Sequence, residues 1–138
     1  MKLTIGIILL LLIPTLAASD AGTPLERASE AYLKNGAEAF IIELMKGSPL
    51  EGEKSVATQS NNLRQIEDYY GKYIDYDVVL QKNLTDKVRI VYYVMNYEKS
   101  PVFGVANYYK IDGDEVVTSF NFNTEWAPII PMALLFND

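Results

Sequence analysis

Tyrosine and carboxylate side chains are the groups that could carry chemistry in this 138-residue chain, because it contains neither histidine nor cysteine. Their absence excludes nucleophilic catalysis by a Ser-His-Asp or Cys-His system, and it excludes zinc and copper sites built on those ligands. The eight glycines are scattered singly, so the sequence has no glycine-rich phosphate-binding loop. We therefore expect no catalytic residue, no metal site and no cofactor.

Asp75 and Asp77 are the carboxylates whose spacing could suit acid–base chemistry. Side chains two residues apart in a strand share one face and lie roughly 6–7 Å apart. Proton abstraction would need one of them inside a pocket, where desolvation raises its pKa. Both alternate with apolar residues, which predicts a solvent-exposed face instead. We expect Arg89, the only arginine in the predicted sheet, to pair with one of these aspartates across strands.

The ten tyrosines supply the candidates for a binding site. Tyr92 with Tyr93, and Tyr108 with Tyr109, place one ring on each face of neighbouring predicted strands, so one ring of each pair should be in the core. The candidates for lining a pocket between helices and sheet are Tyr76, Tyr92 and Tyr108. The candidates for an interface on the opposite face or in the C-terminal tail are Tyr93, Met95, Phe103, Ile130 and Leu134. An apolar second face must be covered by the tail, by another subunit or by a ligand.

Helices are expected ahead of the strands. Thr23 followed by Glu26 three residues later has the pattern of a capping box. Apolar residues at helical spacing then predict a helix over 24–46, kinked or split at Asn35-Gly36, and a second helix over 55–70.

From Lys72 onward the hydrophobic period becomes two, which is typical of strands. Strands are predicted over 72–81, 88–97, 102–111 and 115–123, and Asp112-Gly113 is a strong hairpin signal. In the first strand the residues expected on the apolar face are Ile74, Tyr76, Val78 and Leu80, and those expected on the wet face are Tyr73, Asp75, Asp77 and Gln81. The sequence therefore predicts an α+β fold in which one or two N-terminal helices pack on a curved, four-stranded antiparallel meander.

The segment after the last strand, 127–138, is an apolar tail with prolines at 128 and 131. Two prolines disfavour both a central strand and a long helix. We expect the tail to fold back over the sheet or a helix, or else to cover a neighbouring subunit.

Several short patterns occur in the order typical of a known scaffold. They are Gly71-Lys72-Tyr73, Tyr92-Tyr93 through Tyr97-Glu98, Tyr108-Tyr109-Lys110, Asp112-Gly113 and Phe120-Asn121-Phe122. Over about 71–123 the chain resembles small exported proteins with NTF2-like or cystatin-like α+β folds. The resemblance implies a scaffold, since none of the shared patterns carries chemistry. Among NTF2-like enzymes, ketosteroid isomerase uses an aspartate base and a tyrosine donor in an apolar pocket.

The N-terminus has the pattern of a secretory signal peptide. Lys2 is followed by an apolar run, by Pro14 and by the small residues Ala17 and Ala18. We expect residues 1–19 to be removed, leaving one domain over 20–138 that is exported to a bacterial periplasm or the extracellular space. After cleavage no stable membrane anchor is expected.

The formal net charge of −6 makes binding to nucleic acid unfavourable, since phosphate backbones would be repelled. The sequence favours an exported, non-enzymatic binding or accessory domain that acts through its sheet surface or a helix–sheet pocket. Its expected partner is a second copy or an unidentified envelope protein. The alternative function is that of a cofactor-free isomerase or cyclase of NTF2 type that uses aspartate and tyrosine.

Overall fold

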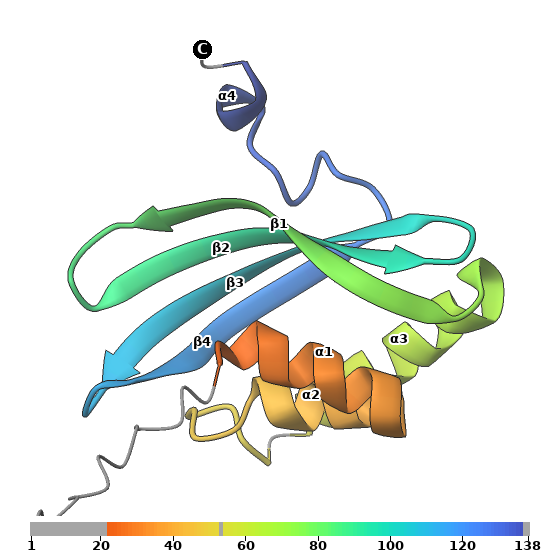
Figure 1. The fold of residues 1–138 in the computed structure, drawn as a ribbon, viewed down its shortest axis with the longest axis horizontal. Coiled ribbons are helices and arrows are strands. Elements are labelled where there is room, and N and C mark those ends of the chain that lie inside the picture. The colour runs from red at the N-terminus through yellow and green to blue at the C-terminus, as the bar shows by residue number, and fades with distance from the viewer. Residues whose placement is uncertain (1–21, 53, 137–138) are drawn as a thin grey trace, which may run out of the picture.

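The computed structural model describes residues 22–52 and 54–136, so the predicted signal peptide lies outside the described residues. The elements in chain order are α1 (Pro24–Asn35), α2 (Ala37–Leu44), α3 (Ser55–Tyr70), β1 (Tyr73–Asn83), β2 (Val88–Tyr97), β3 (Pro101–Ile111), β4 (Asp114–Asn123) and α4 (Met132–Leu135). The strands form one antiparallel sheet in the order β1-β2-β3-β4. Helices α1, α2 and α3 lie against one face of this curved sheet (Figure 1). The predicted α+β class and the antiparallel meander are confirmed.

The helix boundaries follow the predicted capping signals. The Thr23 hydroxyl accepts a hydrogen bond from the backbone amide of Glu26, and the Glu26 carboxylate accepts one from the amide of Thr23, which completes the capping box. Gly36 adopts a φ of 90°, a conformation that favours glycine, and it separates α1 from α2 as expected for a split helix. The capping box thus sets the start of α1, and Gly36 sets its end.

The core lies between the helices and the inner face of the sheet. Phe40, Ile41 and Leu44 of α2 are fully buried in it. Complete burial of such a side chain stabilises a fold by about 1.5–3 kcal/mol. From β2 the core receives Tyr93 and Met95, both fully buried. The prediction that these two residues form an outward interface is therefore wrong.

Space on the neighbouring strand decides which tyrosine of β2 faces the core. Tyr93 pairs directly with Gly104 of β3, and a Cβ atom built on Gly104 would lie 2.2 Å from the ring carbon Cζ of Tyr93. The ring thus occupies the volume that any other residue at position 104 would need. Tyr92 consequently points to the helix-free face, beside Val105.

Strand β1 departs from the simple alternation that its sequence predicts. Its register with β2 shifts between Tyr73 and Asp75 and again between Val78 and Leu80. An extra residue in one strand reverses which side chains face inward. Tyr73 is buried at 7% exposure, whereas Ile74 is 50% exposed, so the predicted faces of these two residues are wrong.

Three tyrosines form a hydrogen-bonded cluster where α1 meets the sheet. The Tyr97 hydroxyl donates to the Tyr32 hydroxyl at 3.1 Å, and Tyr32 donates to the Glu67 carboxylate at 2.8 Å. Tyr73 stacks on Tyr32 with 4.3 Å between ring centroids and shares a 2.7 Å hydrogen bond with the hydroxyl of Ser29. Burial raises the pKa of Tyr73 to about 12. The cluster therefore holds α1 to β1, β2 and α3 through satisfied polar groups.

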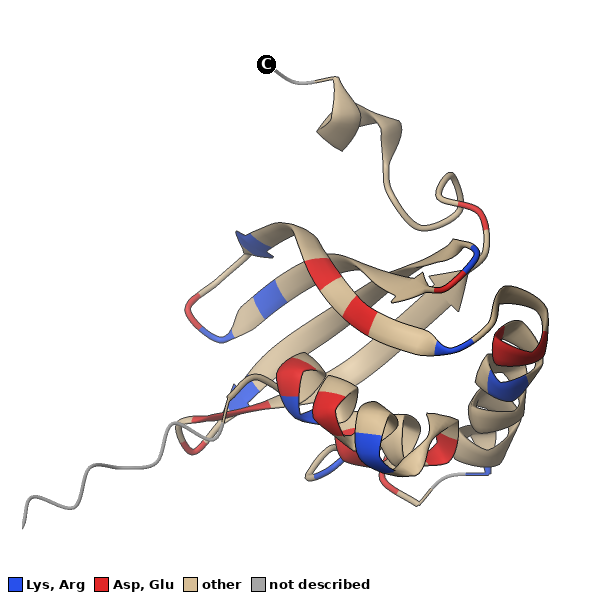
Figure 2. Ribbon diagram, turned by 45° about the vertical axis from the view of Figure 1, so that its right-hand side comes forward, with Lys and Arg blue, Asp and Glu red and all other residues tan. Residues whose placement is uncertain are grey.

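The C-terminal segment crosses the helix-free face of the sheet and then leaves it (Figures 1 and 2). Ile129 and Ile130 are only 5% and 4% exposed, although they lie outside the main core cluster. Beyond them, Met132 and Phe136 are 64% and 74% exposed, and Leu134 is half-buried. The two isoleucines are thus buried on the helix-free side, whereas α4 stands away from the body (Figure 1).

Candidate ligand-binding cleft

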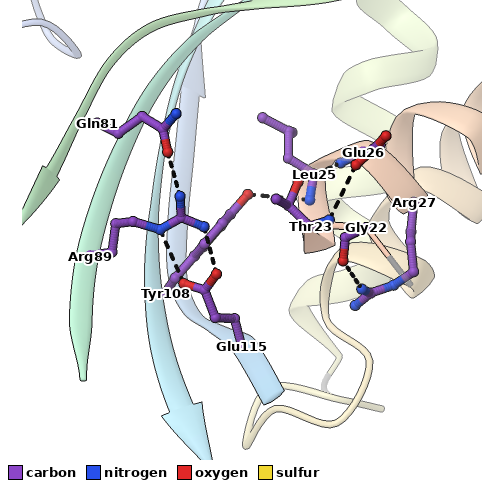
Figure 3. Close-up of polar contacts among 9 residues, drawn as sticks. All are labelled: Gly22, Thr23, Leu25, Glu26, Arg27, Gln81, Arg89, Tyr108 and Glu115. Atoms are coloured by element: carbon purple, nitrogen blue, oxygen red, sulfur yellow. Dashed lines mark hydrogen bonds and ion pairs between the residues drawn. The ribbon is translucent and has the colours of Figure 1, made fainter. Parts of the chain in front are cut away.

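The inner face of the sheet is open where it extends past the N-terminal end of α1. A cavity of about 240 Å³ lies there between Thr23 at the start of α1 and the strands β1, β2 and β3. Its polar and aromatic lining residues are Thr23, Glu26, Gln81, Arg89, Tyr76 and Tyr108, and its apolar lining residues are Leu25, Val78 and Val91. Figure 3 shows how several of these side chains converge. We call this cavity the inner hollow.

A second, more polar hollow adjoins the first at the end of the sheet. It has a volume of about 680 Å³ and is lined by the β1–β2 hairpin and by Lys110 and Glu115. Arg89 lines both cavities, so its side chain lies between them. We call the second cavity the outer hollow, and the two together the Arg89 cleft.

Arg89 is held in place by two partners and an aromatic ring. Its Nε and Nη2 atoms donate to the two carboxylate oxygens of Glu115 at 3.1 and 2.6 Å, a bidentate geometry (Figure 3). Its Nη1 atom donates to the Oε1 atom of Gln81. Its Cζ atom lies 4.9 Å from the centroid of the Tyr108 ring, within the range of a cation–π contact. The guanidinium is thus oriented before any ligand arrives.

Tyr108 connects the sheet to the start of α1. Its hydroxyl accepts a hydrogen bond of 3.2 Å from the backbone amide of Leu25, one of the amides that has no partner within the helix (Figure 3). Burial raises the pKa of Tyr108 to about 12, although this amide, the Thr23 side chain and the Arg89 charge all act in the opposite direction. The phenol therefore stays neutral at physiological pH and keeps one proton that it can donate.

Tyr76 faces the same hollow from β1. It is half-buried, and burial together with the negative charge of Glu26 raises its pKa. Tyr76 pairs with Met95, which is a core residue, so both point to the helix-covered side. Tyr76 and Tyr108 both interact with the Thr23 side chain. The hollow thus contains three neutral hydroxyl groups above an apolar wall.

The structure brings together two of the three predicted pocket tyrosines. Tyr76 and Tyr108 line the inner hollow, but Tyr92 lies on the helix-free face, where it pairs with Val105. Of the predicted interface residues, Phe103 is half-exposed on that same face. Ile130 is buried in the C-terminal segment.

The paired aspartates lie outside the cleft. Asp75 and Asp77 both accept hydrogen bonds from the Nδ2 atom of Asn96, at 2.7 and 2.8 Å. They share the exposed face predicted for them, but Arg89 does not pair with either. Asp77 is paired with Val94, five residues along β2 from Arg89, so the predicted ion pair is replaced by the contact with Glu115.

Three residues that line the cleft could not be predicted as site residues from the sequence pattern. Thr23 is recognisable only as a helix cap, Gln81 only as a wet strand residue, and Glu115 only as the start of the last strand. Glu115 reaches Arg89 because β2, β3 and β4 are adjacent in the sheet. That juxtaposition is long-range and cannot be read from spacing along the chain.

Within the described residues no group of three acidic side chains is placed to hold a metal ion. No helix of the described part is long and apolar enough to cross a membrane. Comparison of the chain with protein-family models, with curated proteins and with solved structures finds no match. Arguments about function therefore start from the geometry of the cleft.

Proposed function

We propose that this chain is an exported, non-enzymatic binding domain that takes a small molecule into the Arg89 cleft. The convergence of Tyr76, Tyr108 and Arg89 on one cavity is the observation that carries the proposal. Binding sites for small molecules are typically concave, mostly apolar and furnished with a few oriented polar groups. The inner hollow has this composition. Export is supported by the signal-peptide pattern of residues 1–19.

The contacts of the acidic residues favour binding over proton-transfer catalysis. Glu26 lines the inner hollow, but its carboxylate accepts the Thr23 amide in the capping box. Glu115 is held by the bidentate contact with Arg89. Among the described residues no aspartate lines the inner hollow. An isomerase of NTF2 type would need a free carboxylate against its substrate, so that alternative receives less support.

We also infer an NTF2-like or cystatin-like scaffold. Its support is the order of the elements, with three helices followed by a curved antiparallel meander. In such an arrangement a pocket between helix and sheet is a natural consequence of curvature, because the sheet bends away from the helix at one end.

Amide chemical shifts measured by NMR, with a mixture of neutral, cationic and anionic one-ring compounds, test the proposed function. Compounds that bind should shift the amides around Tyr76, Arg89 and Tyr108. Val78→Trp should abolish binding by filling the inner hollow, which Val78 lines. Val79→Trp is the matched control, because Val79 is 45% exposed and does not line that hollow. Binding that maps elsewhere, or that survives Val78→Trp, would remove the cleft as the site.

The C-terminal segment supports a second proposal, that two copies associate through their helix-free faces. Residues 126–136 contain no charged side chain, so an uncharged apolar surface suits them best. Ile129 and Ile130 are buried in the segment on this side of the sheet, and the helix-free face presents Phe103 and Val105 half-exposed. A second copy offers the same face to the exposed Met132.

Light scattering tests this association. The mature chain, residues 20–138, should have the mass of a dimer at high concentration, and a mature chain ending at residue 131 should be monomeric. Leu33→Ser on α1, which is also an exposed apolar position, is the control and should leave the mass unchanged. A monomeric mature chain at every concentration would exclude the dimer.

A further inference from the structure

We infer that the ligand of the Arg89 cleft is a small apolar carboxylate whose body enters the inner hollow and whose carboxylate binds beside Arg89. This inference rests on the proposed function, because it names the class of molecule that the same cleft would bind. It follows from three features of the cleft: the remaining donors of Arg89, the charge of the outer hollow and the size of the inner hollow.

The guanidinium of Arg89 retains donors after its contacts within the protein are counted. An arginine side chain has five N–H groups. Two bind the carboxylate of Glu115 and one binds Gln81, so one N–H on Nη1 and one on Nη2 remain. A carboxylate is a planar acceptor that matches a guanidinium well. Because Glu115 and the Tyr108 ring already orient the guanidinium, little side-chain entropy would be lost when a second acceptor binds.

The charged residues that line the outer hollow have a net charge opposite in sign to that of the whole chain. Its cationic residues are Lys87, Arg89 and Lys110, and its anionic residues are Asp86 and Glu115, which leaves a small positive excess. The whole chain has a net charge of −6. Neither lysine forms an ion pair with any described residue. Figure 2 shows basic and acidic segments side by side on the two hairpins at this end of the sheet. A small positive excess suits one carboxylate better than a doubly charged phosphate.

The inner hollow limits the size and polarity of the rest of the ligand. Its volume is about 240 Å³, and an apolar cavity of about 150 Å³ is enough to hold benzene. Leu25, Val78 and Val91 form its apolar wall, Tyr76 and Tyr108 also line it, and the Glu26 carboxylate in its lining accepts the amide proton of Thr23. One ring or a short branched chain would therefore fit, with its acidic group directed to Arg89, where the two hollows meet.

Titration of the mature chain, residues 20–138, with three compounds that share a ring and differ in charge tests this assignment. The compounds are benzoate, neutral benzamide and cationic benzamidine, with amide shifts as the readout. Benzoate should bind in the cleft about tenfold more tightly than benzamide, because only the carboxylate gains the charge-assisted contact. Benzamidine should bind most weakly. Added salt should weaken binding of benzoate and leave that of benzamide unchanged.

Lys110→Gln tests the charge of the outer hollow, because Lys110 lines that hollow and makes none of the hydrogen bonds that hold Arg89. This substitution should weaken the binding of benzoate by about threefold to tenfold and leave the affinity for benzamide unchanged. Lys99→Gln, in the turn between β2 and β3, is the control and should change neither affinity.

The outcomes separate this inference from the proposed function. If benzoate and benzamide bind equally well, the carboxylate assignment is overturned while the cleft remains a binding site. The same holds if Lys110→Gln leaves the binding of benzoate unchanged. Failure of benzoate to bind overturns it as well, and binding of other compounds at the cleft would then still support the proposed function. If no compound of any charge shifts the cleft amides, both proposals fail.

Discussion

The hydroxyl of Tyr108 accepts the backbone amide proton of Leu25 at 3.2 Å, across 83 residues of sequence. This one contact joins the third strand to the first turn of the first helix. It sets the position of α1 over the sheet, and with it the mouth of the inner hollow. Because the face of the Tyr108 ring also lies against Arg89, the contact links the end of the helix to the cation of the cleft.

Removal of the Tyr108 hydroxyl should destabilise the fold through the Leu25 amide. In Tyr108→Phe the buried N–H group loses its acceptor, and a buried unsatisfied donor costs about 1–3 kcal/mol. The free energy of unfolding, measured in urea, should fall by that amount. Tyr109→Phe is the matched control, since Tyr109 is the next residue and is 37% exposed; it should change stability by less than about 0.5 kcal/mol. Equal stability of the two variants would contradict the role assigned to this hydroxyl.

The Arg89–Glu115 pair should contribute more to stability than an exposed pair of similar length. The side chains of Arg89 and Glu115 are 21% and 23% exposed, whereas those of Arg64 and Glu38 are 50% and 60% exposed. Both pairs have a closest N–O distance of 2.6 Å. Glu115→Gln should lower the free energy of unfolding, measured in urea, by about 1–3 kcal/mol, and Glu38→Gln should lower it by less than about 1 kcal/mol. A larger cost for Glu38→Gln would reverse the ranking inferred from burial.

A side chain at position 104 should collide with the ring of Tyr93. Gly104 does not adopt a positive φ, so space alone requires glycine there. Gly104→Ala would place a Cβ 2.2 Å from Tyr93 Cζ, and overpacking of a core typically costs about 1–3 kcal/mol. A double-mutant cycle with Tyr93→Ala supplies the control. The cost of Gly104→Ala should largely vanish in that background; if it persists, backbone strain is responsible instead.

Alkaline pH should unfold the protein through its buried tyrosines. Burial raises the pKa of Tyr73 and of Tyr108 from 10.0 to about 12, and it raises the pKa of Tyr32, Tyr93 and Tyr97 as well. Above pH 10 the unfolded chain loses these protons while the folded chain retains them, so the unfolded state binds fewer protons and stability falls as pH rises. The contribution of Tyr73 and Tyr108 is complete below pH 10 and is lost as pH rises through about 12.

Urea unfolding at a series of pH values measures this dependence. The unfolding free energy should decline between pH 10 and 12, with phenolate absorbance appearing together with unfolding. Tyr108→Phe should make the decline shallower, because one proton-linked group is removed. A free energy independent of pH over this interval would show that the tyrosines titrate alike in both states.

Much of the secondary structure could be predicted because its signals are local. Thr23 and Glu26 specify the start of α1, Gly36 divides the first helical region, and Asp112-Gly113 specifies the last hairpin. Each depends on backbone conformation or hydrogen bonds within a few residues, and such preferences are properties of the amino acids themselves. The change of hydrophobic period at Lys72 likewise separates helices from strands.

Which side chains meet was decided only by the tertiary structure. The sequence does not show which of the adjacent Tyr92 and Tyr93 is buried in the core. Tyr93 is buried because Gly104, on the neighbouring strand, has no side chain and leaves space for its ring. The register shifts in β1 exchange the positions of Tyr73 and Ile74 without any local signal. The pairing of Arg89 with Glu115 requires the order of strands in the sheet. The elements thus follow from short-range conformational preference, whereas the cleft depends on long-range steric fit and strand register, which no spacing along the chain encodes.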